Sequence, residues 1–291
     1  MHTDEQSLHA KLEEIRQRVP PADSSPQLHS HSKPSNDAVL RLAKTAGSCR
    51  TLVVAFGSLG GQHDFQAACR RTGVEHALFI RDVKQAWFLL GVDDIGERSF
   101  AATLSAVAAE MSALQPRRLV LLGTSMGGYA AVRTALELQQ CDVDEISVLV
   151  FAPQICIDPD ERSGCLELPP MPFDANLHTA KRAWVAQGRG TRLPSAIDAL
   201  LRQDGQRGPV RAIDVHVGSS SLADVYEAAL LRRAAEEHPA GRMCVAVTTH
   251  EGMGHQLAEA LRDDMLLDAI LSDVVAGAAR PCASPMDLGG A

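Results

Sequence analysis

A serine with glycines two positions away on both sides is the first candidate for a reactive group in the sequence. The run 123–128 reads GTSMGG and places Ser125 between an apolar strand-like segment at 119–122 and a helix-like segment that begins near 129. A Gly-x-Ser-x-Gly pattern indicates a nucleophile only in this strand-turn-helix context. The glycines leave room for strand and helix to approach each other around a strained serine. We therefore expect Ser125 to be a nucleophile; a glycine-rich turn with Ser125 as a helix cap is the alternative.

A serine hydroxyl attacks only when a base accepts its proton, and the base is expected to be a histidine. Two of the 11 histidines, His250 and His255, lie in the loop predicted after the last strand. We expect His255 to be the base, because it follows a glycine at the entry to a helix and its ring can swing toward the strand ends. His250, in the same loop, stays open as the alternative base. It could equally be a loop histidine that is hydrogen-bonded to the backbone.

An acid that orients the imidazole is expected after the preceding strand. Asp214 lies near the amino end of the predicted strand 212–217, whereas sites of this sheet type form at carboxyl ends. Asp224 lies past the carboxyl end, so we expect it to be the acid. The alternative is that Asp224 only complements the dipole of the helix that begins near residue 222. The chain order Ser125, Asp224, His255 is the order expected for this kind of nucleophile turn.

Backbone amides must stabilise the oxyanion that forms when a serine attacks a carbonyl. One donor is expected to be the N–H of Met126, directly after the nucleophile. The other is expected from the loop after the strand 51–56, where Ser58 is our candidate. Its neighbours Gly57 and Leu59 are candidate substrate-binding residues. This loop matches neither Gly-x-Gly-x-x-Gly nor the Gly-Lys-Ser/Thr phosphate loop, which argues against a nucleotide cradle.

The segment 154–209 interrupts the strand-helix pattern and predicts a cap with structure of its own. It carries Trp184 and Arg189 as candidate substrate-binding residues. Met171 and Phe173 either line an acyl pocket or pack the cap. Its basic residues could steer an anionic acyl carrier or a phosphorylated glycan, with a solvated surface as the alternative. These basic residues are Lys181, Arg182, Arg189 and Arg192.

Strand-like and helix-like segments alternate from residue 38 onward, and this alternation predicts an α/β fold. A mostly parallel sheet covered by helices on both faces requires such a pattern. We expect the strand 39–44 to pair with the strand 51–56. The remaining strands are expected at 76–81, 118–122, 146–151, 212–217 and 244–249. Helices are expected at 65–71, 99–114, 127–139, 222–237 and 256–274.

The chain is predicted to have one main domain with additions. Residues 1–37 are expected to form an N-terminal helix over 4–19 and a flexible linker rich in proline and serine. Residues 38–279 form the α/β domain, with the cap inserted at 154–209. A flexible tail is expected at 280–291.

Composition argues against several classes of function. The 291 residues carry a net charge of −8 and only 4% aromatic residues, which disfavours nucleic-acid binding. No apolar run reaches the about 18 residues needed to span a membrane, and the start of the chain is acidic and polar. The seven cysteines include no Cys-x-x-Cys pair, and His29 and His31 lack partners at metal-ligand spacing. We expect a cytoplasmic protein without a metal or cofactor.

Taken together, these residues resemble the α/β-hydrolase superfamily over about residues 38–275. Within it, the segments 56–57, 78–82, 123–129 and 151–154, with Trp87, are similar to a bacterial group. That group includes serine esterases and acyltransferases that act on cell-surface glycans, among them the accessory-secretion O-acetyltransferases. The resemblance implies ester or acyl transfer. Asp82 has two possible roles. It could have a function specific to this bacterial group, or it could be an acid that caps a helix or forms an ion pair after a strand.

Three hypotheses about function follow. The first is a serine hydrolase that cleaves a small-molecule or glycan ester or thioester through an acyl-serine intermediate. The second is an O-acyltransferase that moves the acyl group to a sugar or another alcohol. The third is a member of the fold that binds or assembles without catalysis. The first two share the acyl-serine step, so Ser125, His255 and Asp224 alone do not separate them.

Overall fold

The computed structural model describes residues 38–43, 49–60, 63–91, 99–138, 142–166, 173–201, 210–237, 243–263 and 265–277. The N-terminal helix and linker expected at 1–37, the tail expected at 280–291, and Met171 lie outside the described residues. The strands are β1 (Val39–Ala43), β2 (Thr51–Phe56), β3 (His76–Ile80), β4 (Arg118–Thr124), β5 (Glu145–Phe151), β6 (Val210–Gly218) and β7 (Cys244–His250).

The strands described form one sheet in the order β1-β3-β2-β4-β5-β6-β7. Every neighbouring pair is parallel except β1 with β3, which is antiparallel. The expected pairing of β1 with β2 is therefore wrong. The two edges of β2 are occupied by β3 and β4, so β1 is left to pair with the outer edge of β3.

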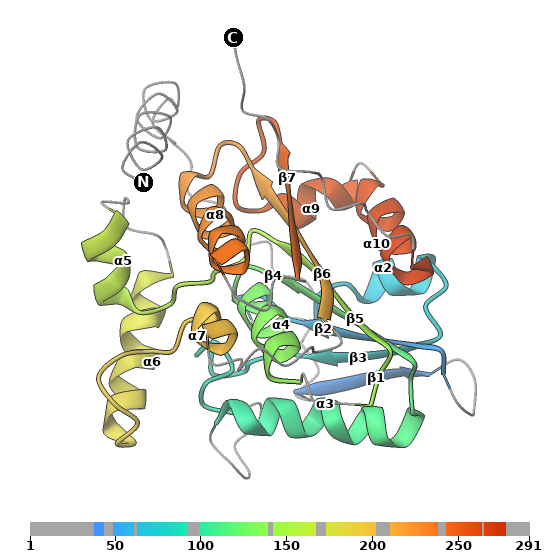
Figure 1. The fold of residues 1–291 in the computed structure, drawn as a ribbon, viewed down its shortest axis with the longest axis horizontal. Coiled ribbons are helices and arrows are strands. Elements are labelled where there is room, and N and C mark those ends of the chain that lie inside the picture. The colour runs from blue at the N-terminus through green and yellow to red at the C-terminus, as the bar shows by residue number, and fades with distance from the viewer. Residues whose placement is uncertain are drawn as a thin grey trace.

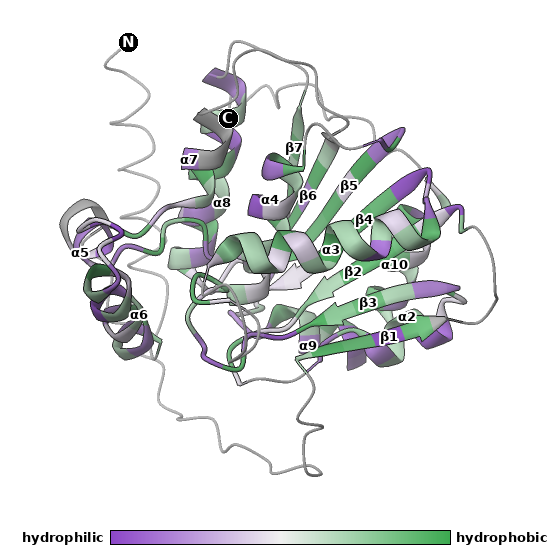
Figure 2. Cartoon of the chain, turned by 90° about the horizontal axis from the view of Figure 1, so that it is seen from below, coloured by the Kyte–Doolittle hydropathy of each residue, from purple (hydrophilic) through white to green (hydrophobic). Residues whose placement is uncertain are grey.

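Helices cover both faces of this sheet (Figure 1). One face packs against α3 (Phe100–Leu114), α4 (Met126–Glu137) and α8 (Leu222–Glu237). The opposite face packs against α2 (Gln66–Arg71), α9 (Leu257–Asp263) and α10 (Leu266–Ala276). The strands are mostly apolar along their length, as Figure 2 shows, because a sheet covered on both faces buries the side chains of its central strands.

Strand β2 shows how one short sequence supplies two cores. Leu52, Val54 and Phe56 point into the core under α3, α4 and α8. Val53 and Ala55 point into the core under α2, α9 and α10. All five are at most 1% exposed. Burying each of the larger side chains contributes about 1.5–3 kcal/mol, so the central strands anchor both layers at once.

Two other expectations differ from the structure. The helix predicted at 256–274 is two helices, α9 and α10, and Met265 between them has a left-handed φ of 62°. The sequence shows no glycine or proline there that would have predicted the break. Cys244 is disulfide-bonded, which the cysteine pattern did not predict.

The cap contains three helices in the part of the chain that is described. They are α5 (Pro159–Leu166), α6 (Asp174–Ala186) and α7 (Ala196–Leu201), and all lie between β5 and β6 in sequence. In Figure 1, α5 and α6 stand to one side of the sheet. The segment between β5 and β6 therefore contains helices rather than one long loop.

A buried carboxylate joins the cap to the main domain. Glu227 of α8 accepts the backbone N–H groups of Ile155 at 2.6 Å and Cys156 at 2.7 Å. It also forms an ion pair with Arg162 of α5, and both side chains are at most 8% exposed. Burial raises the pKa of the Glu227 carboxyl above its usual value, while Arg162 and the two amides oppose that rise. The start of the cap is thus held by the Glu227 carboxylate, which is stabilised by its ion pair with Arg162.

We predict that Arg162→Met destabilises the fold in a pH-dependent way. Losing the cation raises the folded-state pKa of Glu227 further above its unfolded value, so stability falls as pH rises through the folded pKa. The loss should be smallest near pH 5 and reach about 3–5 kcal/mol near pH 8. Urea unfolding of variant and parent at several pH values measures it.

The matched control is Arg192→Met, because Arg192 pairs with Glu161 and Asp198 while 50% exposed. It should cost less than about 1 kcal/mol. An equal loss for Arg162→Met at pH 5 and pH 8 would contradict the role assigned to the buried pair.

Candidate functional site

Ser125 lies at the sharp turn between β4 and α4. Its backbone has φ 52° and ψ −119°, a combination that side-chain-bearing residues rarely adopt. The turn is held by hydrogen bonds on both sides. The Ser125 N–H donates to the carbonyl of Phe151 at 2.9 Å, and the Ser125 carbonyl accepts the N–H of Gly128 at 3.0 Å. Strained backbone of this kind persists where the surrounding structure holds it, as it does at many functional sites.

The glycines around Ser125 are required by contact distances. A Cβ on Gly123 would lie 2.2 Å from the carbonyl oxygen of Gly127, and a Cβ on Gly127 would lie 2.2 Å from that of Phe56. A Cβ on Gly128 would lie 2.7 Å from the side chain of Pro153. No side chain fits at these distances, so the serine turn packs directly on the ends of β2 and β5.

Ser125, His255 and Asp224 form a continuous hydrogen-bonded cluster, called here the Ser–His–Asp cluster. Ser125 Oγ lies 2.9 Å from His255 Nε2. His255 Nδ1 lies 2.8 Å and 3.0 Å from the two carboxylate oxygens of Asp224. Since a carboxylate only accepts, the neutral imidazole carries its proton on Nδ1, and Nε2 is left to accept the serine proton.

The loops that carry His255 and Asp224 are bound to each other. The N–H of Ser220, after β6, donates to the carbonyl of Met253 at 2.9 Å, and the N–H of Ser219 donates to the carbonyl of His250 at 2.9 Å. A Cβ on Gly218 would lie 2.1 Å from the Met253 carbonyl oxygen. This contact brings the first turn of α8, with Asp224, up to the histidine loop.

His250 and Asp214, the alternatives left open by the sequence, have other surroundings. His250 Nε2 is 2.9 Å from Nδ1 of His216, and the two rings stack at 5.2 Å. Asp214 lies in the middle of β6, which begins at Val210 rather than at the expected residue 212. The structure thus brings Asp224 and His255 to Ser125, and gives His250 a different partner.

The two expected oxyanion amides differ in their surroundings. Met126 is the first residue of α4, where backbone N–H groups have no acceptor within the helix. The Ser58 N–H, by contrast, donates to the carboxylate of Asp64 at 2.7 Å. The Gly57 N–H donates to the carbonyl of Ile80 at 2.8 Å. Two amides of this loop are therefore engaged within the protein.

Asp64 is a residue of this region that the sequence did not single out. Burial raises the pKa of its carboxyl, and the hydrogen bonds from Ser58 oppose that rise. The available signal was an aspartate a few residues after a glycine-containing loop, a pattern typical of side-chain-stabilised turns. Asp64 holds the loop beside the serine turn.

The cap residue Phe173 lies beside the Ser–His–Asp cluster. The ring of Phe173, just before α6, lies 6.0 Å from the ring of His255. The guanidinium of Arg162 lies 5.1 Å from the same Phe173 ring. Phe173 is 5% exposed, and the His255 side chain remains 27% exposed. Phe173 thus belongs to the buried core, as expected of a packing residue, and also lies beside His255.

The other cap residues named from the sequence lie farther along. Trp184 is 11 positions after Phe173 on α6, which corresponds to roughly 16 Å along the helix. The Arg189 guanidinium lies 5.4 Å from the Trp184 ring. Lys181 pairs with Asp158 and Asp160, so acids of the cap itself neutralise it. The structure does not bring Trp184 or Arg189 to the Ser–His–Asp cluster.

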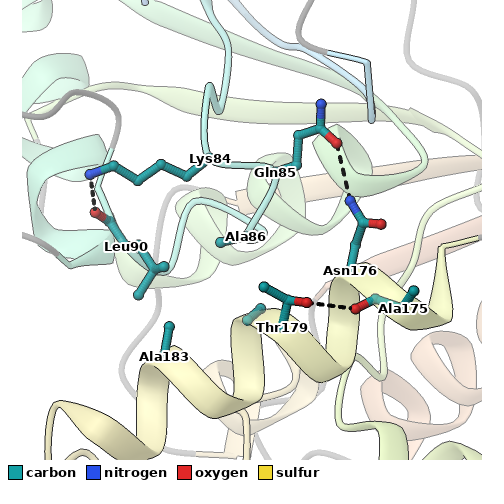
Figure 3. A pocket seen from close by; sticks show the side chains of 9 residues that line it. Lys84, Gln85, Ala86, Leu90, Ala175, Asn176, Thr179 and Ala183 are labelled. Atoms are coloured by element: carbon teal, nitrogen blue, oxygen red, sulfur yellow. Dashed lines mark hydrogen bonds between the residues drawn. The ribbon is translucent and has the colours of Figure 1, made fainter.

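A cavity of about 210 Å³ lies between the loop 84–90 and α6 (Figure 3). Gln85 accepts a hydrogen bond from Asn176 across it at 3.0 Å, and Lys84 donates to the carbonyl of Leu90 at 3.2 Å. None of its lining residues belongs to the Ser–His–Asp cluster. It marks the seam between cap and main domain.

The ranges that the structure describes contain neither a cluster of metal ligands nor a membrane-spanning helix. No group of three or more His, Cys, Asp or Glu side chains there is arranged to hold a metal ion. In the same ranges, no helix combines the length and apolar character that crossing a membrane requires.

A scan against protein-family models and a search of curated proteins both give no match. Solved structures do match. An esterase from Thermogutta terrifontis has a TM-score of 0.51 at 17% identity, over 84% of this chain and 90% of the esterase. A hormone-sensitive lipase from a metagenome library has a TM-score of 0.51 at 14% identity, over 93% of this chain and 90% of the lipase.

A glycosylation-associated protein complex, Gap123 from Streptococcus agalactiae, matches with a TM-score of 0.50 at 12% identity. The match covers 80% of this chain but only 46% of the other, so this chain spans less than half of that protein's length. Identities this low carry information about the fold alone. The sheet order, the serine turn between β4 and α4, and these matches together show that the chain has the α/β-hydrolase fold.

Proposed function

We propose that this protein is a serine hydrolase that cleaves an ester or thioester through an acyl-serine intermediate. The observation that carries the proposal is the hydrogen-bonded chain from Ser125 Oγ through His255 to Asp224, with separations of 2.9 Å and 2.8 Å. The strained backbone of Ser125 supports it as well. A helix cap would need neither feature, and a purely structural serine would not require a base aligned on its hydroxyl.

In the proposed reaction, Ser125 Oγ forms a bond to the substrate carbonyl carbon while its proton passes to His255 Nε2. Asp224 stabilises the imidazolium that results. The tetrahedral intermediate then expels the alcohol or thiol, which takes the proton from His255, and the acyl group remains on Ser125. Water attacks this ester as His255 accepts a proton, and collapse releases the acid and restores the serine.

The oxyanion is assigned to the Met126 amide and one amide of the loop 57–59. Because the Ser58 N–H already donates to Asp64, the neighbouring Leu59 N–H becomes our candidate for the second donor. The loop is close enough for this role, since the carbonyl oxygens of Phe56 and Gly57 would contact a Cβ on Gly127. In this proposal Asp64 holds the loop in place.

Acyl transfer to an alcohol is the second candidate. Phe173 of the cap lies against the ring of His255, so the cap covers part of the approach of water to the base. A sugar as acceptor follows from the resemblance of the sequence to glycan acyltransferases, and the match to a glycosylation-associated complex adds only the shared fold. A non-catalytic binding role, the third hypothesis, gives no reason for the aligned Ser–His–Asp cluster.

We predict that Ser125→Ala abolishes labelling by an alkyl fluorophosphonate and lowers ester hydrolysis by at least about 10⁴-fold. The probe reacts only with an activated serine hydroxyl. Labelling is read by mass spectrometry and hydrolysis by release of p-nitrophenol from a short acyl ester. Ser58→Ala, a serine of the facing loop, should keep its label. An unlabelled parent, or a labelled Ser125→Ala variant, would refute the proposed nucleophile.

We predict that Asp224→Asn lowers kcat about 10³- to 10⁴-fold, because an amide no longer holds the Nδ1–H tautomer of His255. Asp214→Asn should change kcat by less than about 10-fold, since Asp214 lies in mid-strand. Steady-state kinetics of both folded variants, with circular dichroism as the folding check, compare them. A greater loss in Asp214→Asn would reassign the acid.

We predict that the parent releases mainly free acid when a p-nitrophenyl ester is hydrolysed in the presence of millimolar alcohol. Phe173→Ala should raise the ratio of acid to transferred ester further, because it uncovers His255 to water. Trp184→Ala, at the far end of α6, should leave the ratio unchanged. Chromatography of the products measures it, and predominant transfer in the parent would favour the acyltransferase instead.

A further inference from the structure

A loop without glycine adopts left-handed backbone three times between Asp82 and Leu89. Gln85, Trp87 and Phe88 have φ values of 51°, 54° and 59°. Bulky side chains avoid this region of backbone space, and clusters of such residues mark sites where a function requires the geometry. The strained backbone therefore indicates that this loop holds one of its side chains in a defined position.

The carboxylate of Asp82 imposes this geometry. It is fully buried and accepts the N–H groups of Lys84 at 2.9 Å, Ala86 at 2.6 Å and Phe88 at 2.8 Å. Of the two roles left open by the sequence, Asp82 thus acts as a capping acid, but for a loop rather than a helix. Its effect is to fix the residue between the last two amides, Trp87.

The indole N–H of Trp87 forms one hydrogen bond. Its Nε1–H donates to Oε1 of Gln154 at 2.6 Å, and the two residues are 0% and 2% exposed. An indole nitrogen only donates, so the group that faces it must be the amide oxygen. The orientation of the Gln154 amide is therefore fixed by chemistry, and its NH₂ group faces away from the indole.

The NH₂ group of Gln154 is buried, and no residue in the described part of the chain accepts a hydrogen bond from Nε2. Buried donors in folded proteins are nearly always paired, and an unpaired one calls for an explanation. A ligand oxygen would supply the acceptor. The strained loop fixes the amide oxygen of Gln154 on Trp87, and the unpaired donor is the nitrogen of the same amide.

Gln154 lies directly against the Ser–His–Asp cluster. Its backbone N–H donates to the carbonyl of Ser125 at 3.2 Å. On its other side, the Trp87 ring lies 6.3 Å from Phe173, and the Phe173 ring lies 6.0 Å from His255. Gln154 thus contacts the backbone of Ser125 directly, and Trp87 and Phe173 link its side chain to the ring of His255.

We propose that Gln154 is a substrate-binding residue whose side-chain NH₂ donates a hydrogen bond to an oxygen of the substrate near the scissile bond. This inference rests on the proposed serine hydrolase function. The class of substrate that it selects is an ester bearing an ether or hydroxyl oxygen in its acyl or alcohol group, in preference to a purely aliphatic ester. Trp87 and Asp82 are positioning residues, because they act through the orientation of this amide.

The competing role for Gln154 is structural, as the acceptor that satisfies the indole of Trp87. The two roles predict different outcomes when both partners are replaced by apolar groups. If Gln154 serves only Trp87, then Gln154→Met combined with Trp87→Phe removes donor and acceptor together and restores parental behaviour. If Gln154 binds substrate, the double variant stays defective toward oxygenated esters.

The test uses two pairs of esters that differ by one oxygen in place of a methylene. The acyl pair is p-nitrophenyl butyrate and p-nitrophenyl methoxyacetate, and the alcohol pair is butyl acetate and 2-methoxyethyl acetate. For each pair, the ratio of kcat/KM values is divided by the ratio of the uncatalysed hydrolysis rates, which removes intrinsic reactivity. The parent, Gln154→Met, Trp87→Phe and the double variant are compared.

We expect the parent to prefer the oxygenated member of at least one pair. Gln154→Met and the double variant should each lose at least about 10-fold of that preference, since a lost hydrogen bond to a buried donor has this magnitude. Trp87→Phe, which keeps the amide but releases its orientation, should lose less. Fluorophosphonate labelling of Ser125 should still be detected in all three variants, because Gln154 contacts the serine turn through its backbone N–H, which these substitutions keep.

Three results would overturn the inference. They are unchanged preference in Gln154→Met for both pairs, parental preference in the double variant, and loss of fluorophosphonate labelling in Gln154→Met, which would assign Gln154 to building the serine turn. Failure of the proposed function is distinguishable, because it appears as an unlabelled parent. A labelled parent with unchanged preference refutes this inference alone.

Discussion

The close approach of three backbone segments at Ser125 is the constraint on which the rest of the structure depends. The turn after β4 touches the end of β2 through Gly127 and the end of β5 through Gly128, at distances where no Cβ fits. This contact forces Ser125 to φ 52° and presents its hydroxyl at the carboxyl edge of the sheet. The central strands supply the rigidity, because their side chains are buried in two cores at once.

Buried and partly buried carboxylates then organise the loops around this edge. Asp82 binds amides of the loop that carries Trp87, Asp64 binds the amide of Ser58, and Glu227 binds amides at the start of the cap. Burial raises the pKa of all three carboxyls, so each is held in an environment that disfavours its charge. Such groups are expensive to bury unless hydrogen-bonded, and that requirement gives the loops defined conformations.

The fold was largely predictable from local pattern. Apolar runs such as 119–122 and 146–151 form β4 and β5, and the helix predicted at 222–237 is α8. The errors arose where position in the sheet or packing decides the outcome. The strand β1 pairs with β3 because β2 already has two neighbours, and the helix after β7 breaks at Met265 without any glycine or proline. Local sequence does not record which edge of a strand is free.

The candidate site divides in the same way. The sequence by itself determined that Ser125 would stand at a glycine-lined turn, since only glycine permits the backbone contacts there, and it ordered Asp224 before His255. Only the tertiary structure decided that Asp224 and His255 hydrogen-bond, that Ser58 gives its amide to Asp64, and that Phe173 lies beside His255. It also brought Trp87 and Gln154, which are 67 positions apart, into a hydrogen bond of 2.6 Å between Nε1 and Oε1. The physical reason is range: backbone geometry is written in adjacent residues, whereas a hydrogen bond between distant side chains exists only after packing has brought their elements together.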